Sequence, residues 1–160
     1  MTGMVRDAAD LMALTQMELD DLYRQSPAGE SPKGDTQGTV LFAPGTSFAK
    51  PVAVYMRLSS WQGKVFDRRR PGLENKITPI GIKAIAALVY YGSSWVDGRP
   101  CIVIDYSRTS LVACLIRDEI REVAPGLYLG VVFLGHMKIL NFALSSPMRV
   151  GGQDTVQPAA

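Results

Sequence analysis

The residues best suited to chemistry lie in the charged segment 116–122 (Ile-Arg-Asp-Glu-Ile-Arg-Glu), which interrupts a long apolar region of this sequence. In an extended strand alternate side chains point to opposite faces, so Asp118 and Glu119 would lie on different faces. One face must point into the interior, and a buried charge costs several kcal/mol unless it is partnered or neutralised. A carboxylate of this segment, and an arginine with it, are therefore candidates for burial. The competing interpretation, which we favour from the sequence, is an ion-pair ladder on the outer surface.

Acid–base chemistry is the reaction type that these side chains suit best. A carboxyl group with a raised pKa beside a tyrosine can exchange protons near neutral pH. Asp105 and Tyr106 end the preceding apolar run, which would place them beside the charged segment. The candidate catalytic residues are Asp118, Glu119 and Tyr128. The candidate ligand-binding residues are Trp61, Lys64, Asp105, Tyr106, Arg117, Arg121 and Asn141.

Two of these candidates also have ordinary structural explanations. Trp61 precedes Gly63 at the start of an extended segment, where tryptophan often packs across one end of a small barrel, and we favour that role over stacking on a ligand. Asn141 is a lone polar residue among apolar neighbours. It could orient a ligand or serve as a hydrogen-bonded core amide, and the sequence leaves both explanations open.

The single histidine, His136, limits the chemistry further. One histidine excludes a multi-histidine zinc site, and the cysteines have no metal-ligand spacing around it. Neither a Gly-Lys-Ser/Thr phosphate loop nor a Gly-x-Gly-x-x-Gly motif is present. We interpret His136 as a solvent-facing turn residue, and an axial haem ligand is the alternative. We expect no cofactor and no metal.

Composition predicts one domain over residues 1–145 with a disordered tail at 146–160. The net charge of +2 and a longest basic run of Arg68–Arg70 disfavour nucleic-acid binding.

We expect Cys101 and Cys114 to be buried thiols in a reducing cytoplasm, with a disulfide between them as the less favoured alternative. No signal-peptide pattern and no apolar run of about 18 residues is present, which predicts neither secretion nor membrane spanning.

Five apolar runs between Lys83 and Leu144 carry the prediction of fold. The connections between them are too short for crossover helices, so neighbouring strands should be antiparallel. The predicted strands are 83–91, 99–106, 110–123, 127–134 and 138–144. The fold class is therefore mainly β, an up-and-down meander that closes into a barrel.

The N-terminal half predicts a mixture of elements. Apolar spacing predicts one helix over 7–25, with a capping box at Thr15–Glu18 inside it. The Pro- and Gly-rich segment 26–37 predicts a loop that lets the helix lie against, or plug, whatever the strands enclose. The remaining expectations are a strand at 38–43, a second short helix at 51–61 with strand as the alternative, an extended segment at 63–67 and a short strand at 73–79.

Several motifs together resemble small bacterial lipocalin-like proteins of the GXWXG type. The matching motifs, all between residues 61 and 130, are Trp61-x-Gly63-Lys64-x-Phe66, Asn75-Lys76, Asp97-Gly98, Asp105-Tyr106, the charged segment to Arg121, and Gly126-Leu127-Tyr128-Leu129-Gly130. The resemblance implies a calycin-like barrel with an interior ligand cavity. Such barrels commonly bind apolar small molecules, and some act as cyclases or isomerases.

Two functions are therefore expected. The first is binding of a small, largely apolar molecule inside a barrel, oriented by polar interior residues. The second is an enzyme on the same scaffold, which would cyclise or isomerise a polyketide-like or terpenoid-like substrate by confinement and acid–base catalysis. We expect no nucleic-acid or membrane partner, and exposed strand edges could support a homodimer.

Overall fold

The computed structural model describes residues 4–41, 61–66, 72–77, 86–108 and 114–146; for residues 61–66, 72–77 and 86 it describes the backbone alone. Two helices come first, α1 (Ala8–Met12) and α2 (Gln16–Gln25). The strands are β1 (Gly34–Asp35), β2 (Gln37–Leu41), β3 (Trp61–Phe66), β4 (Gly72–Ile77), β5 (Ala86–Ser93), β6 (Pro100–Asp105), β7 (Ile116–Ala124), β8 (Leu127–Leu134) and β9 (Met137–Ser145).

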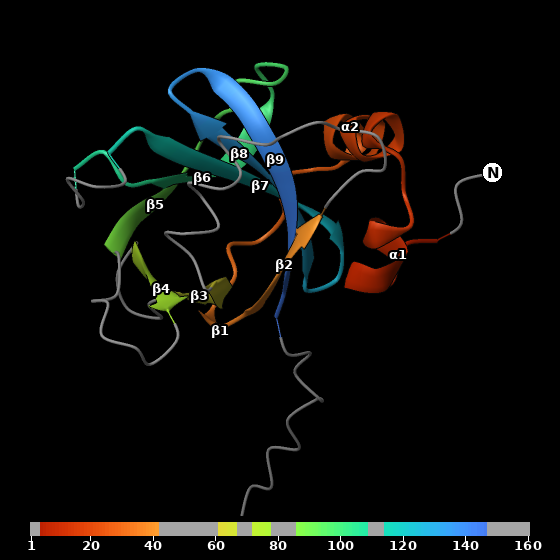
Figure 1. The fold of residues 1–160 in the computed structure, drawn as a ribbon, viewed down its shortest axis with the longest axis horizontal. Helices are drawn as coiled ribbons and strands as arrows, with labels where there is room; N and C mark the ends of the chain where they lie inside the picture. The colour runs from red at the N-terminus through yellow and green to blue at the C-terminus, as the bar shows by residue number, and fades with distance from the viewer. Residues whose placement is uncertain (1–3, 42–60, 67–71, 78–85, 109–113, 147–160) are drawn as a thin grey trace, which may run out of the picture.

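The strands form one antiparallel sheet in the order β1-β3-β4-β5-β6-β7-β8-β9-β2. From β3 to β9 every strand pairs with the next one along the chain, so the predicted antiparallel meander is confirmed. The two ends of this order are β1 and β2, and a single residue, Thr36, separates them in the chain. The fold is thus mainly β, with two short helices on one side of a curved sheet (Figure 1).

The single helix predicted over 7–25 is wrong, because two helices occupy this segment. Asp7 caps α1, and its side chain accepts a hydrogen bond from the Asp10 amide. Thr15 has an extended backbone and forms a reciprocal capping box with Glu18, which begins α2. A capping box satisfies the free amides at a helix start, so it marks a new helix rather than the middle of one.

Three predicted boundaries also change. The segment 26–37 is not a loop throughout, because it contains β1 and the first residue of β2. The strand predicted from residue 110 begins at Ile116, after a turn at 114–115. Trp61 belongs to β3, whereas residues 51–60, on which the second helix was predicted, lie outside the described residues. Residues 147–160 of the predicted tail lie outside them as well.

Buried side chains form two clusters, one on each face of the sheet. The inner cluster consists of Ala87, Val89, Ile102, Ile104, Tyr106, Ile116, Ile120, Tyr128, Val132, Ile139, Leu140, Phe142 and Leu144. The helix-side cluster consists of Leu11, Leu19, Tyr23, Leu41, Leu127, Leu129, Val131, Phe133 and Ala143, so the two helices cover the opposite face. Residues 127–133 of β8 are all buried, because the strand is covered on both faces. This explains why its sequence is a nearly continuous apolar run.

Candidate functional site

The charged segment 116–122 forms most of β7, and α2 covers one face of this strand. On that face the carboxylate of Glu119, with no exposed surface, accepts four hydrogen bonds. At Oε2 the donors are the Ser94 hydroxyl (2.5 Å) and the Tyr23 hydroxyl (3.2 Å). At Oε1 they are the Trp95 amide (2.9 Å) and Arg117 Nε (3.0 Å). Glu119 therefore ties α2 and the turn after β5 to the sheet.

Arg121 lies on the same face and is also fully buried. Its guanidinium donates to both carboxylate oxygens of Asp97, at 2.8 and 2.7 Å. It also donates to the backbone carbonyls of Tyr23 (2.9 Å), Pro100 (3.1 Å) and Arg99 (3.1 Å). The hydrogen bonds from Arg121 hold the pKa of Asp97 below its usual value, so this carboxyl stays ionised.

These contacts overturn the favoured expectation of an exposed ion-pair ladder. Glu119 and Arg121 are buried, and the expectation of a buried carboxylate and arginine is confirmed instead. Sequence alternation could not reveal this, because the face opposite the inner cluster would be solvated if α2 did not cover it. Ser94, Asp97 and Tyr23 were not recognised from the sequence. The cluster of turn residues beside Trp95 was a signal for Ser94 and Asp97, whereas Tyr23 of α2 had none.

The other face of β7 carries a different arrangement. Asp118 has no exposed surface and lies between Ile116 and Ile120 of the inner cluster. In the neighbouring strands its register partners are Ile104 and Val132, which are aliphatic as well. The buried Tyr106 hydroxyl donates to Asp118 Oδ2 at 3.2 Å. A carboxyl and a phenol are thus in contact within an apolar interior, which is the arrangement that acid–base chemistry or polar anchoring of a ligand requires.

Tyr128 belongs to the inner cluster but lies apart from the Asp118–Tyr106 pair. Its hydroxyl donates to the Glu30 carbonyl at 2.7 Å. Burial, and secondarily the charge of Glu122, raises the pKa of Tyr128 well above its usual value. Tyr128 is therefore a protonated hydrogen-bond donor at neutral pH. The three candidate catalytic residues occupy three separate environments: Asp118 inside, Glu119 under α2, and Tyr128 beneath the segment that follows α2.

The remaining candidates lie outside the interior pair. Asp105 accepts hydrogen bonds from the Ser107 amide (2.8 Å) and the Tyr90 hydroxyl (3.3 Å). Asn141 receives a hydrogen bond from Gln16 (2.8 Å) and donates to the Gly130 carbonyl (3.1 Å), as a core amide would. Arg117 lies over the ring of Trp95, 4.3 Å from its centroid. The side chains of Trp61 and Lys64 in β3 are not among those described.

His136 is exposed, as the turn interpretation predicts, and it stacks on Trp95 with a 4.4 Å centroid separation. Within the described ranges no group of three or more His, Cys, Asp or Glu side chains is placed to hold a metal. Neither described helix is long and apolar enough to cross a membrane.

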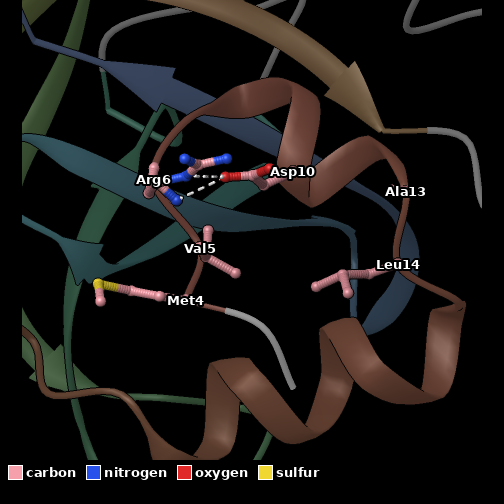
Figure 2. Close-up of a pocket in the computed structure, with 6 residues that line it drawn as sticks. All are labelled: Met4, Val5, Arg6, Asp10, Ala13 and Leu14. Carbon is pink, nitrogen blue, oxygen red and sulfur yellow. Dashed lines mark hydrogen bonds and ion pairs between the residues drawn. The ribbon is translucent and has the colours of Figure 1, made fainter. Parts of the chain in front are cut away.

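A hollow of about 460 Å³ lies beside α1, away from all of these candidates (Figure 2). Its lining consists of Met4, Val5, Arg6, Asp10, Ala13 and Leu14. Arg6 closes one side through hydrogen bonds from its amide and its Nε to Asp10 Oδ2. None of the predicted site residues lines it, so it offers no support for the chemistry considered above.

The cysteines differ in environment, which corrects the expectation that both are buried. Cys101 is a fully buried thiol, whereas Cys114 is exposed. Burial, with a further contribution from the Glu119 charge, raises the pKa of the Cys101 thiol to about 12. The thiolate is the reactive form, so at pH 8 we expect iodoacetamide to label Cys114 and to leave Cys101 unlabelled in folded protein.

Mass spectrometry of labelled tryptic peptides measures this difference. Denatured protein provides the control, because both thiols should then react at similar rates. Labelling of folded protein that is equally fast at Cys101 would contradict the burial of this side chain under α2.

Comparisons with known proteins place the fold but not the activity. No family model matches the chain, and no curated protein matches its sequence. A crystal structure of a protein from Thermomonospora curvata is similar in fold, with a TM-score of 0.57. The alignment covers 84% of this chain and 89% of that one at 17% identity, a similarity that concerns the fold alone.

Proposed function

We propose that this protein is a lipocalin-like barrel that binds a small, largely apolar molecule inside its sheet, with Asp118 and Tyr106 orienting the polar group of that molecule. Closure of the barrel would occur at residues 34–41. The pairing of β1 with β3 and of β2 with β9 supports closure, because these adjacent segments take up both ends of the strand order.

The buried Asp118–Tyr106 pair is the observation that carries the proposal. A carboxyl buried among aliphatic side chains destabilises a fold unless its hydrogen bonds offset the loss of hydration. Ligand sites combine an apolar lining with a few placed polar groups, and the Asp118–Tyr106 pair in its aliphatic surroundings fits that pattern. The buried Cys101 thiol supports a reducing, cytoplasmic setting.

The same pair favours the second candidate function, an enzyme that cyclises or isomerises a polyketide-like or terpenoid-like substrate. Asp118 would accept a proton and Tyr106 would donate one, with confinement of a flexible substrate supplying much of the rate. This assignment replaces Glu119 and Tyr128 in the catalytic roles. The Glu119 carboxylate and the Tyr128 hydroxyl each form hydrogen bonds with protein groups outside the Asp118–Tyr106 pair.

Two conservative variants test the proposal. Asp118→Asn and Tyr106→Phe keep the shape of the interior, so we expect each to change the unfolding free energy by less than about 1.5 kcal/mol. We expect each to weaken binding of an uncharged, environment-sensitive naphthalene dye bearing a hydroxyl group by about tenfold, since Asp118→Asn replaces a carboxyl acceptor and Tyr106→Phe removes a hydroxyl donor for that group. Fluorescence titration and urea unfolding measure the two quantities.

Asp105→Asn is the matched control, because Asp105 bonds to Tyr90 and Ser107 rather than to the inner pair. It should bind the dye as the parent protein does. Equal dye affinity in Asp118→Asn, Tyr106→Phe and Asp105→Asn would show that the inner pair is not a ligand anchor.

A further inference from the structure

The segment that follows α2 crosses from the helix side of the sheet to β1 (Figure 1). We refer to its residues 28–31 (Ala-Gly-Glu-Ser) as the strap. Side chains of three strands hold the strap: Tyr91 from β5, Glu122 from β7 and Tyr128 from β8. Tyr128 belongs to the inner cluster, and Glu122 follows Asp118 and Ile120 on the same face of β7. The strap therefore lies over one end of the interior.

The strap is attached mainly through side-chain hydrogen bonds. Tyr91 Oη donates to the Gly29 carbonyl and accepts from the Ser31 amide, both at 3.0 Å. Tyr128 Oη donates to the Glu30 carbonyl at 2.7 Å, and Glu122 Oε2 accepts from the Glu30 amide at 3.2 Å. One backbone bond, from the Glu122 amide to the Ala28 carbonyl (3.3 Å), adds to these. Such an attachment can open without breaking the strand pairing of the sheet.

Two glycines let the strap bend and approach the sheet closely. Gly29 has φ of +74°, and a Cβ built on it would lie 2.3 Å from Glu122 Cβ. Gly34, at the start of β1, has φ of +75°. Both are conformations that other residues adopt only with strain, so the two glycines mark positions where the backbone can turn.

We propose that the strap is a gate: residues 28–31 close one end of the interior, and a ligand enters and leaves when the hydrogen bonds to Tyr91, Glu122 and Tyr128 release it. This inference rests on the proposed function, because a gate needs an interior site to serve. The strap contacts stabilise the closed form whether or not a ligand is bound. Weakening them should therefore accelerate ligand binding and release together and leave the affinity nearly unchanged.

The double variant Tyr91→Phe/Tyr128→Phe tests the gate, because it removes three strap hydrogen bonds and keeps both rings. We expect hydrogen–deuterium exchange of a peptide covering the strap to accelerate about tenfold while exchange in β8 and β9 stays as in the parent. We expect stopped-flow association and dissociation rates of the hydroxylated naphthalene dye each to rise at least about threefold, with Kd constant within about twofold.

Tyr90→Phe is the matched control, since the Tyr90 hydroxyl bonds to Asp105 on a neighbouring strand and not to the strap. Unchanged dye rates in the double variant would overturn the gate, and so would unchanged exchange of the strap. A parent protein that binds no dye would instead reject the proposed function, and the gate with it. The gate is supported if strap exchange and both dye rates rise in the double variant and stay at parent values in Tyr90→Phe.

Discussion

Arg121→Met should lower the free energy of unfolding by about 3–5 kcal/mol. Methionine fills much of the same volume but donates no hydrogen bond. The carboxylate of Asp97 would then lose its bidentate partner, and the carbonyls of Tyr23, Pro100 and Arg99 would lose a donor as well. The cost is large because the ionised Asp97 carboxylate would lose its charged partner, and the three carbonyls would each lose one donor in a buried setting unless α2 moved away from the sheet.

Urea unfolding followed by circular dichroism measures this loss. Arg24→Met is the matched control, because Arg24 is half exposed and forms a 3.6 Å ion pair with the more exposed Asp21. We expect the control to change the unfolding free energy by no more than about 0.5 kcal/mol. Similar effects of the two substitutions would contradict the role assigned to Arg121 in holding α2 on β7.

Gly130→Ala should destabilise the protein by about 1–3 kcal/mol, a large effect for one added methyl group. A Cβ at this position would lie 2.2 Å from Cζ of Phe142, whose ring covers Gly130 in the paired strand β9. Phe142 has no exposed surface and lies within the inner cluster, so its ring can move only by displacing other buried side chains.

The partner substitution tests the cause. Phe142→Leu removes the ring atoms that the new methyl group meets, so the double variant Gly130→Ala/Phe142→Leu should be more stable than the two single effects added together. Gly92→Ala serves as the control, because its nearest contact, Val103 Cγ2, lies at 3.1 Å and demands a smaller adjustment. Additive effects in the double-mutant cycle would contradict a direct clash between Gly130 and Phe142.

The strands were predictable because their signals are local. Short turns such as Asp97-Gly98 and Pro125-Gly126 separate apolar runs and permit only antiparallel neighbours. The capping box of Thr15 and Glu18 was a local signal for the break between the two helices. The prediction missed this break because the apolar spacing continues across it. Local signals of this kind identify an element and its approximate bounds, not its surroundings.

The environment of the charged segment was not predictable, because it depends on what packs against each face. Alternation separates Asp118 from Glu119, but it does not say that α2 covers the Glu119 side. Partners distant in sequence decide the outcome: Tyr23 and Ser94 for Glu119, Asp97 for Arg121, and the strap for Tyr128. Only Tyr106, which directly follows the strand β6 that pairs with β7, was foreseen as a neighbour of Asp118.

The proposed function requires that Asp118 and Tyr106 hold a small molecule inside the sheet. Native mass spectrometry of freshly purified full-length protein tests it most directly. We expect the parent and Asp105→Asn to carry the same small-molecule mass excess, and Asp118→Asn and Tyr106→Phe to have lost most of it. A parent protein that is folded and has the mass of the bare chain, or an excess that all four proteins retain equally, would contradict the claim.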